Sequence, residues 1–215
     1  MNHTPSLKEE MATVVVCVTG LLLSIAGLAV MAASTAVYGD VWQVVSFSLY
    51  GASLVTLFTA SLLFHAVQEL RVKRFFEIAD QSAIYLLIAG TYMPFTLVTL
   101  RGVLGWSMFG VIWGLALVGI LVTWLVPAEK LKLFSSLSYL AMGWLIVIGA
   151  QPLLERLPLA GILWLVAGGV LYSAGVPLFF FKQRPYAHTV WHLFVLAGAV
   201  CHYIVVQFYV TPILP

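Results

Sequence analysis

Two histidines stand one helical turn apart in the stretch HTVWH, at His188 and His192. Residues four apart on an α-helix lie about 40° from each other around the axis. Both rings can therefore reach one ion, as they do in other helical zinc motifs. His65 ends a different apolar stretch and offers a third imidazole. Three neutral nitrogens and an open fourth position are the usual ligand set of a catalytic zinc, so the sequence predicts His65, His188 and His192 as zinc ligands.

Two oxygen-bearing side chains accompany these histidines. Ser61 lies one turn before His65 on the same helical face, and Asp80 precedes the next apolar stretch. A zinc of this type lowers the pKa of bound water to about 7. Asp80 is then expected to orient or deprotonate that water, and Ser61 to bond the water or a substrate oxygen. Simpler interpretations stand beside these: Asp80 as a helix N-cap, and Ser61 bonded to its own helix.

The composition requires a membrane. Of the 215 residues, 62% are hydrophobic and 8% are charged, whereas soluble domains carry about 25% charged residues. We therefore expect an integral membrane protein, without a nucleic-acid-binding surface. The two cysteines, Cys17 and Cys201, lie inside apolar stretches and predict neither a disulfide framework nor a multi-cysteine metal cluster.

The apolar stretches divide the chain into seven spans. A span needs about 20 mostly apolar residues. The predicted spans are 12–34, 42–66, 82–100, 103–126, 133–152, 159–181 and 187–211. The predicted fold class is thus all-α, a seven-transmembrane helix bundle forming a single domain over 1–215. Residues 1–11 are predicted to be a polar tail and 67–80 a charged loop, and Gly110 with Gly114 forms a small-xxx-small pair typical of close helix contact.

The basic residues predict the orientation of this bundle. Eight of the ten fall on one side: Lys8, Arg71, Lys73, Arg74, Lys130, Lys132, Lys182 and Arg184. Because basic loops stay cytoplasmic, the N-terminus is predicted to be cytoplasmic and the C-terminus outside. The three histidines and Asp80 then share the cytoplasmic level, where costly ionisable groups near spans indicate function.

Two further residues inside the spans are assigned to packing. His202 lies ten residues beyond His192, about 15 Å deeper at 1.5 Å per residue, which is too far for the same ion. We expect a buried, hydrogen-bonded core histidine there, with a proton or substrate path as the alternative. Cys17 is about one turn into the first span, where we expect it to pack in the core, with an approach to the site as the alternative.

Three motifs resemble those of the hemolysin III family, which belongs with the progestin and adipoQ receptors and, more distantly, the alkaline ceramidases. They are SLLFH (61–65), ADQSAIYLLIAGTYMPF (79–95) and HTVWHLFVLAGAVCHY (188–203). The resemblance implies a seven-helix membrane protein of the bacterial inner membrane. It also implies a zinc held by His65, His188 and His192 near the cytoplasmic side, with Asp80 contacting a bound water and Ser61 supporting the site.

The N-terminal motif departs from the family. Bacterial members typically read EExANxxTHGxG, and this chain reads EEMATVVVCVTG over 9–20. Thr13 therefore stands where Asn is usual and Cys17 where His is usual. Any function that depends on those two positions is in question, whereas the predicted zinc positions are intact.

Three classes of function remain open at this stage. The resemblance to ceramidases implies zinc-dependent hydrolysis of a lipid amide, with membrane lipids as partners and a lipid-like substrate. The family name implies cytolysis through a pore, although a chain this apolar suits its own cell's membrane. The third class is a non-enzymatic receptor-like or homeostatic protein with structural zinc. Neither the substrate nor the oligomeric state follows from the sequence.

The charge asymmetry gives a direct test of orientation. Single cysteines introduced as Lys73→Cys and Pro215→Cys should react differently with a membrane-impermeant thiol reagent in intact cells. The probe at position 215 should be labelled and the probe at position 73 protected, because the basic loop is retained inside. The unsubstituted chain, which retains Cys17 and Cys201, gives the background. Labelling at position 73 without labelling at position 215 would reverse the orientation.

Overall fold

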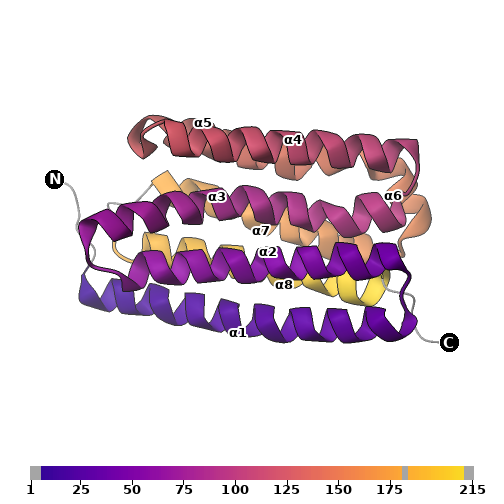
Figure 1. Ribbon diagram of the computed structural model, residues 1–215, viewed down its shortest axis with the longest axis horizontal. Coiled ribbons are helices and arrows are strands. Elements are labelled where there is room, and N and C mark those ends of the chain that lie inside the picture. Colours follow the sequence, from indigo (N-terminus) through magenta and orange to yellow (C-terminus); the bar gives the residue numbers. More distant parts are fainter. Residues whose placement is uncertain (1–5, 181–183, 211–215) are drawn as a thin grey trace.

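The computed structural model describes residues 6–180 and 184–210, and these ranges contain helices and turns but no strand. Seven helical segments in this part are long and apolar enough to cross a membrane, which confirms the predicted fold class. They run side by side in Figure 1. The segments are α1 (Leu7–Tyr38), α2 (Val41–Ala66), α3 (Leu70–Pro94) with a π-helical turn (Phe95–Thr99), α4 (Val103–Leu125), α5 (Ala128–Trp144) continued by a 3-10 turn (Leu145–Gly149) and α6 (Ala150–Arg156), α7 (Leu159–Phe180), and α8 (Ala187–Val205) with a second π-helical turn (Val206–Val210).

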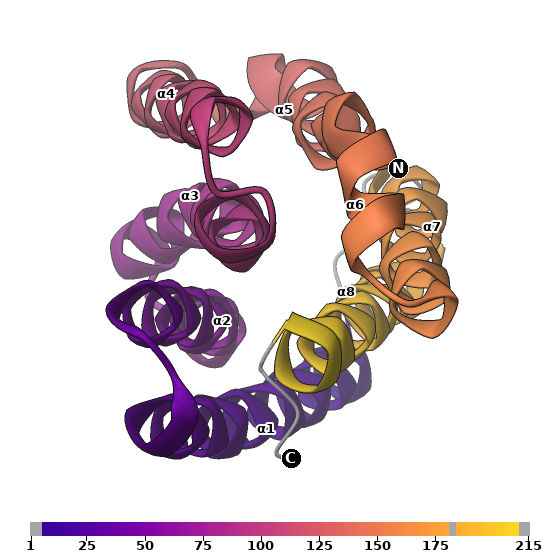
Figure 2. The same cartoon turned by 90° about the vertical axis from the view of Figure 1, so that its right-hand side faces the viewer.

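The helices follow one another around the bundle in chain order, and the last helix returns to the first. Figure 2, which looks along the bundle, shows α8 between α1 and α7. Both neighbours contact α8. The most enclosed span is α3 with its π-helical turn, in which 72% of the most apolar window is buried inside the protein. This arrangement brings α1, α2 and α8 together although α8 lies more than a hundred residues away in sequence.

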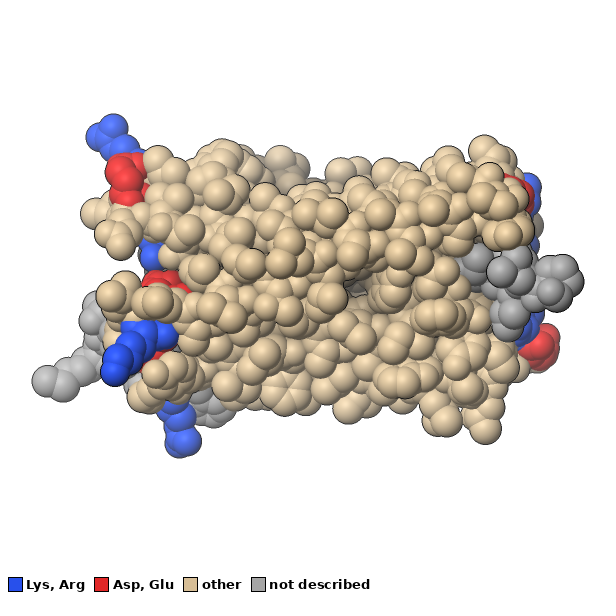
Figure 3. All heavy atoms as spheres, turned by 90° about the horizontal axis from the view of Figure 1, so that it is seen from below, with Lys and Arg blue, Asp and Glu red and all other residues tan. Residues whose placement is uncertain are grey.

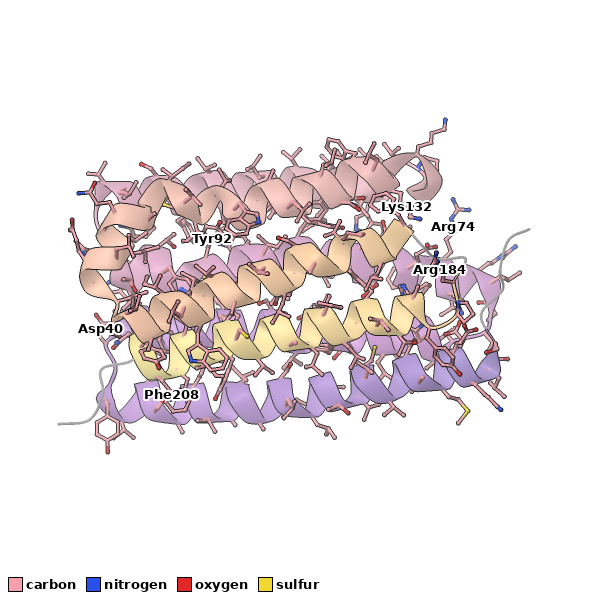
Figure 4. The ribbon with its side chains drawn as sticks, turned by 180° about the vertical axis from the view of Figure 1, so that it is seen from behind. Asp40, Arg74, Tyr92, Lys132, Arg184 and Phe208 are labelled. Atoms are coloured by element: carbon pink, nitrogen blue, oxygen red, sulfur yellow. The ribbon has the colours of Figure 1, made fainter. Side chains whose placement is uncertain are left out.

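Charged side chains are confined to the two ends of the bundle. On the face drawn in Figure 3, Lys, Arg, Asp and Glu lie at these ends, and the surface between them carries other residues only. Figure 4 places Arg74, Lys132 and Arg184 at one end, called the basic end below, and Asp40 at the other. Of the residues behind the orientation prediction, Lys182 and Pro215 lie outside the described residues. The basic end is the predicted cytoplasmic end.

The third span begins well before the predicted position. The sequence 67–80 was expected to be a loop, but α3 starts at Leu70. Its N-cap is Glu69, whose carboxylate accepts hydrogen bonds from the backbone N–H groups of Arg71 and Val72 at 3.1 and 2.9 Å. Asp80 therefore lies inside the helix, and the N-cap interpretation of Asp80 is wrong. The first turns of α3 carry charged residues and lie outside the apolar region. The change in hydropathy along the sequence therefore does not mark where the helix begins.

The predicted polar tail is also partly helical. α1 begins at Leu7, and Ser6 and Glu9 form a capping box across its first turn. Ser6 N–H donates to the Glu9 carboxylate at 2.6 Å. Satisfying these free N–H groups fixes where α1 starts, and thus which side chains of its first turns face α8.

Helices come into close contact where an aromatic ring of one helix packs on a glycine of another. Gly27 of α1 packs on Tyr203 of α8, and Gly119 of α4 packs on Tyr85 of α3. The predicted contact at Gly110 and Gly114 is wrong, because a Cβ atom at either glycine would meet nothing within 4 Å. These two glycines lie on an exposed face of α4, and sequence spacing alone does not tell which face meets a neighbour.

The two kinds of glycine on α4 provide a matched test of packing. Gly119→Ala would place a methyl group against the Tyr85 ring, which is held by a 2.8 Å hydrogen bond to Ser138. Overpacking typically costs about 1–3 kcal/mol, so the melting temperature of the purified protein should fall. Gly110→Ala should leave it unchanged or raise it, because alanine favours helix more than glycine does. Equal melting temperatures for the two variants would contradict this packing.

Candidate metal centre

Three histidines from two helices converge at the basic end. His65 lies in the last turn of α2, and His188 and His192 lie in the first two turns of α8. The Nε2 atoms of His188 and His65 are 3.1 Å apart, and those of His192 and His188 are 3.2 Å apart. One ligand atom from each of the three residues lies within 4.8 Å of the others. The predicted triad therefore comes together in the fold.

Two of the separations between these nitrogens are close to those around one tetrahedral metal ion. Two nitrogens bound to a zinc ion at ~2.0–2.1 Å would lie about 3.3 Å apart in tetrahedral geometry, close to the two separations above. The side chains of His65 and His192 are almost fully buried, and the His65 side chain is 5% exposed. Three imidazoles whose Nε2 atoms converge are a donor set that suits zinc, copper, iron or nickel.

The opposite nitrogens of these rings face groups supplied by α1. His65 Nδ1 lies 2.8 Å from a carboxylate oxygen of Glu10, and His192 Nδ1 lies 4.0 Å from the Cys17 sulfur. Cys17 is completely buried, so it packs in the core, as expected, and also approaches the site. Sequence reasoning missed Glu10, although its position in the EE pair near the start of the first span was a usable signal.

Ser61 and Asp80 are brought together by the packing of α2 on α3. The Ser61 hydroxyl, which is 1% exposed, donates a hydrogen bond to the Asp80 carboxylate. Ser61 thus bonds to a neighbouring helix rather than back to its own. It lies four residues before His65, so this pair sits about 6 Å further into the bundle than His65. Asp80 is also within electrostatic range of the Cys17 thiol.

The two positions that depart from the bacterial pattern face α8. Thr13 Oγ1 lies 2.8 Å from Oγ1 of Thr189, the residue that follows His188 in α8. The Thr13 hydroxyl also donates a hydrogen bond to the Glu9 carbonyl at 3.0 Å. Cys17 follows one turn later beside His192. Both residues therefore contact the helix that carries two of the three imidazoles, without joining the convergent group.

His202 is separate from the metal centre, as its depth predicted. It is not part of the convergent group, and its ring packs edge-on against Tyr172 with centroids 5.3 Å apart. The expected hydrogen bond is absent among the described residues: the Leu165 carbonyl is near, but neither ring nitrogen of His202 completes a bond. His202 instead lines an apolar cavity.

Cavities with different linings lie at the basic end and further into the bundle. A cavity of about 290 Å³ at the basic end is lined by charged and polar side chains, among them Glu10, His65, Lys73, Arg184 and His188, together with apolar surface. An apolar cavity of about 110 Å³ begins at Leu57 and Ile84, one turn further into the bundle than Ser61 and Asp80, and extends to Tyr172 and His202. Another apolar cavity, of about 260 Å³, shares part of this lining and continues toward the opposite end.

The geometry predicts about one metal ion per chain, with zinc as the expected metal. His192→Ala removes one of three ligands and should lose the metal. His202→Ala should keep it, because that ring lies outside the convergent group. Metal content of the purified protein, measured by mass spectrometry, separates the two cases. Equal loss in both variants would contradict the assignment, as would wild-type protein that neither contains nor takes up metal.

Comparison with known proteins gives the family. A model described as Haemolysin-III related matches residues 6–203. The chain is 43% identical to Hemolysin-3 of Bacillus cereus over 209 residues, covering 97% of this chain and 95% of the relative. It is 41% identical to the Hemolysin-3 homolog of Bacillus subtilis, covering 95% of both chains. It is also 31% identical to the human monocyte to macrophage differentiation factor, covering 94% of this chain and 84% of that protein.

These matches extend over the spans and over every residue of the metal centre. The seven apolar helices make the chain a multi-pass integral membrane protein, and its bacterial relatives point to the bacterial inner membrane. The resemblance inferred from the histidine motifs is confirmed. The chain belongs to the haemolysin III family.

Proposed function

We propose that this protein is a zinc-dependent hydrolase that cleaves a lipid amide at the basic end of the bundle. The observation that carries the proposal is the place of the histidines: His65 and His188 line the cavity with charged residues at the basic end, and Trp191, next to His192, lines the apolar cavity. An amphiphile has the same division: its head group suits the polar side, and its hydrocarbon chain suits the apolar side. The bond between head and chain would then lie near the histidines.

The proposed roles follow from the donor atoms. His65, His188 and His192 hold the ion through their Nε2 atoms, the ones that face each other. A bound zinc would supply a Lewis acid that acidifies water and polarises a carbonyl. Asp80 takes the proton of the attacking water, and Ser61 holds that carboxylate through its hydroxyl. Water oxygen bonds to the amide carbon, the carbon–nitrogen bond breaks, and the proton passes to the amine.

A structural role for the metal is the second candidate. The histidines join the end of α2 to the start of α8, and an ion between them would tie these helices together whether or not a reaction occurs. A receptor-like or homeostatic protein would need no more than this. Cytolysis, the activity suggested by the relatives' name, is a weaker candidate, because the apolar belt between the charged ends suits a resident membrane protein.

Asp80→Asn separates the first two candidates. Asparagine keeps the shape and can still accept a hydrogen bond from Ser61, but it cannot take the proton. General-base contributions are typically ~10²–10⁴-fold in rate, so hydrolysis of a panel of lipid amides should fall by that factor while the zinc content is unchanged. If the metal is only structural, no turnover exists to be lost, and His65→Ala instead lowers the melting temperature.

Asp40→Asn provides the matched control for that experiment. Asp40 caps α2 at the opposite end of the bundle, and asparagine caps about as well as aspartate. Its hydrolysis rate and zinc content should equal those of the wild type. An Asp80→Asn protein with full activity would remove Asp80 as the base, and a wild type inactive on lipid amides and esters would contradict the hydrolase.

A further inference from the structure

Glu10 lies between a metal-site histidine and a basic side chain. One of its carboxylate oxygens is 2.8 Å from His65 Nδ1, and the other is 3.3 Å from Lys73 Nζ. The Glu10 side chain is 25% exposed, and the His65 side chain beside it is 5% exposed. Glu10 thus links α1 to the ends of α2 and α3, on the face of His65 that points away from the other two imidazoles.

This contact determines the hydrogen position on His65. A carboxylate oxygen accepts hydrogen bonds, so a proton on Nδ1 of His65 completes this contact by donating to Glu10. In the neutral ring the lone pair is then on Nε2, the atom that faces His188 Nε2 at 3.1 Å. We propose that Glu10 is the positioning residue of the metal centre, holding His65 in the tautomer and orientation in which Nε2 can bind the ion. This inference rests on the proposed metal function of the three histidines.

The start of α1 is built to hold Glu10 in place. Its neighbour Glu9 is buried and accepts hydrogen bonds from Ser6 N–H at 2.6 Å and Tyr186 N–H at 2.9 Å. Tyr186 adopts a left-handed conformation (φ 57°) immediately before α8, so Glu9 fixes the turn that leads into His188. Consecutive helical residues point 100° apart, and Glu10 therefore faces α2 while Glu9 faces α8.

Lys73 is expected to orient Glu10 rather than to stabilise the fold. Its side chain is 30% exposed, and surface ion pairs contribute little. It does restrain the second carboxylate oxygen, and it also lies 5.5 Å from the centroid of the Phe64 ring, next to His65 in the chain. Partners of this kind on ligand histidines typically affect metal affinity by 10–100-fold, because they set the ring orientation and raise ligand basicity.

The affinity of the full-length protein for zinc, measured by chelator competition, tests the role. Glu10→Ala should bind zinc about 10–100-fold more weakly. Glu10→Gln should retain most of the affinity, because its amide oxygen still accepts from Nδ1–H, although a neutral bond is about half as strong. Lys73→Met should have a smaller effect than Glu10→Ala. Glu155→Ala, which removes an exposed carboxylate at the opposite end, should match the wild type.

A spectroscopic measurement on metal-free protein separates positioning from general stability. With ¹⁵N-labelled histidine, His65 should show a protonated Nδ1 in the wild type and in Glu10→Gln, and a mixture of tautomers in Glu10→Ala; His65→Ala assigns the signal. Unchanged tautomer and affinity in Glu10→Ala would overturn the proposal, as would equal losses in the Gln and Ala variants. Wild-type protein that fails to bind zinc would overturn the metal function instead, and the tautomer result would still stand on its own.

Discussion

Helices in lipid gain nothing from the hydrophobic effect by meeting each other, and this constraint governs the whole bundle. Association must come from close packing and from hydrogen bonds between helices. The chain meets the first requirement by seating aromatic rings on glycines, as at Gly27 with Tyr203 and at Gly20 with Phe58. These two contacts hold α1 against both α8 and α2.

The second requirement is met at the basic end, among α1, α2, α3 and α8. Thr13 with Thr189, Ser61 with Asp80 and Glu10 with His65 each join two different helices. Buried polar groups cost free energy unless they are hydrogen-bonded. These bonds therefore offset that cost and fix how the helices meet at this end of the bundle. The imidazoles lie within this network, where their orientation is restricted by neighbours on α1.

The contrast between the two sides of the centre connects this network to the proposed chemistry. Lys73 and Arg184 line the cavity at the basic end, and apolar lining from Leu57 to Tyr172 continues into the membrane region. His202 and Tyr172 are exceptions in the apolar lining, because neither the ring nitrogens of His202 nor the hydroxyl of Tyr172 completes a hydrogen bond with the described residues. A buried polar atom without a hydrogen bond costs free energy of folding, so such side chains are unusual in the lining of an apolar cavity.

The sequence by itself determined the membrane class, the seven spans and the three histidines that share a level, because hydropathy and helical spacing are local properties. It did not determine where α3 begins: the charged turns from Leu70 to Asp80 read as a loop, although Glu69 caps them as helix. Nor did it show that Gly119 meets a neighbour while Gly110 does not, or that Glu10 reaches His65 across 55 residues. Those outcomes depend on how each helix is rotated about its axis and on which helix lies beside it. Only the tertiary structure decides both, since rotation and neighbours are fixed by contacts between distant parts of the chain.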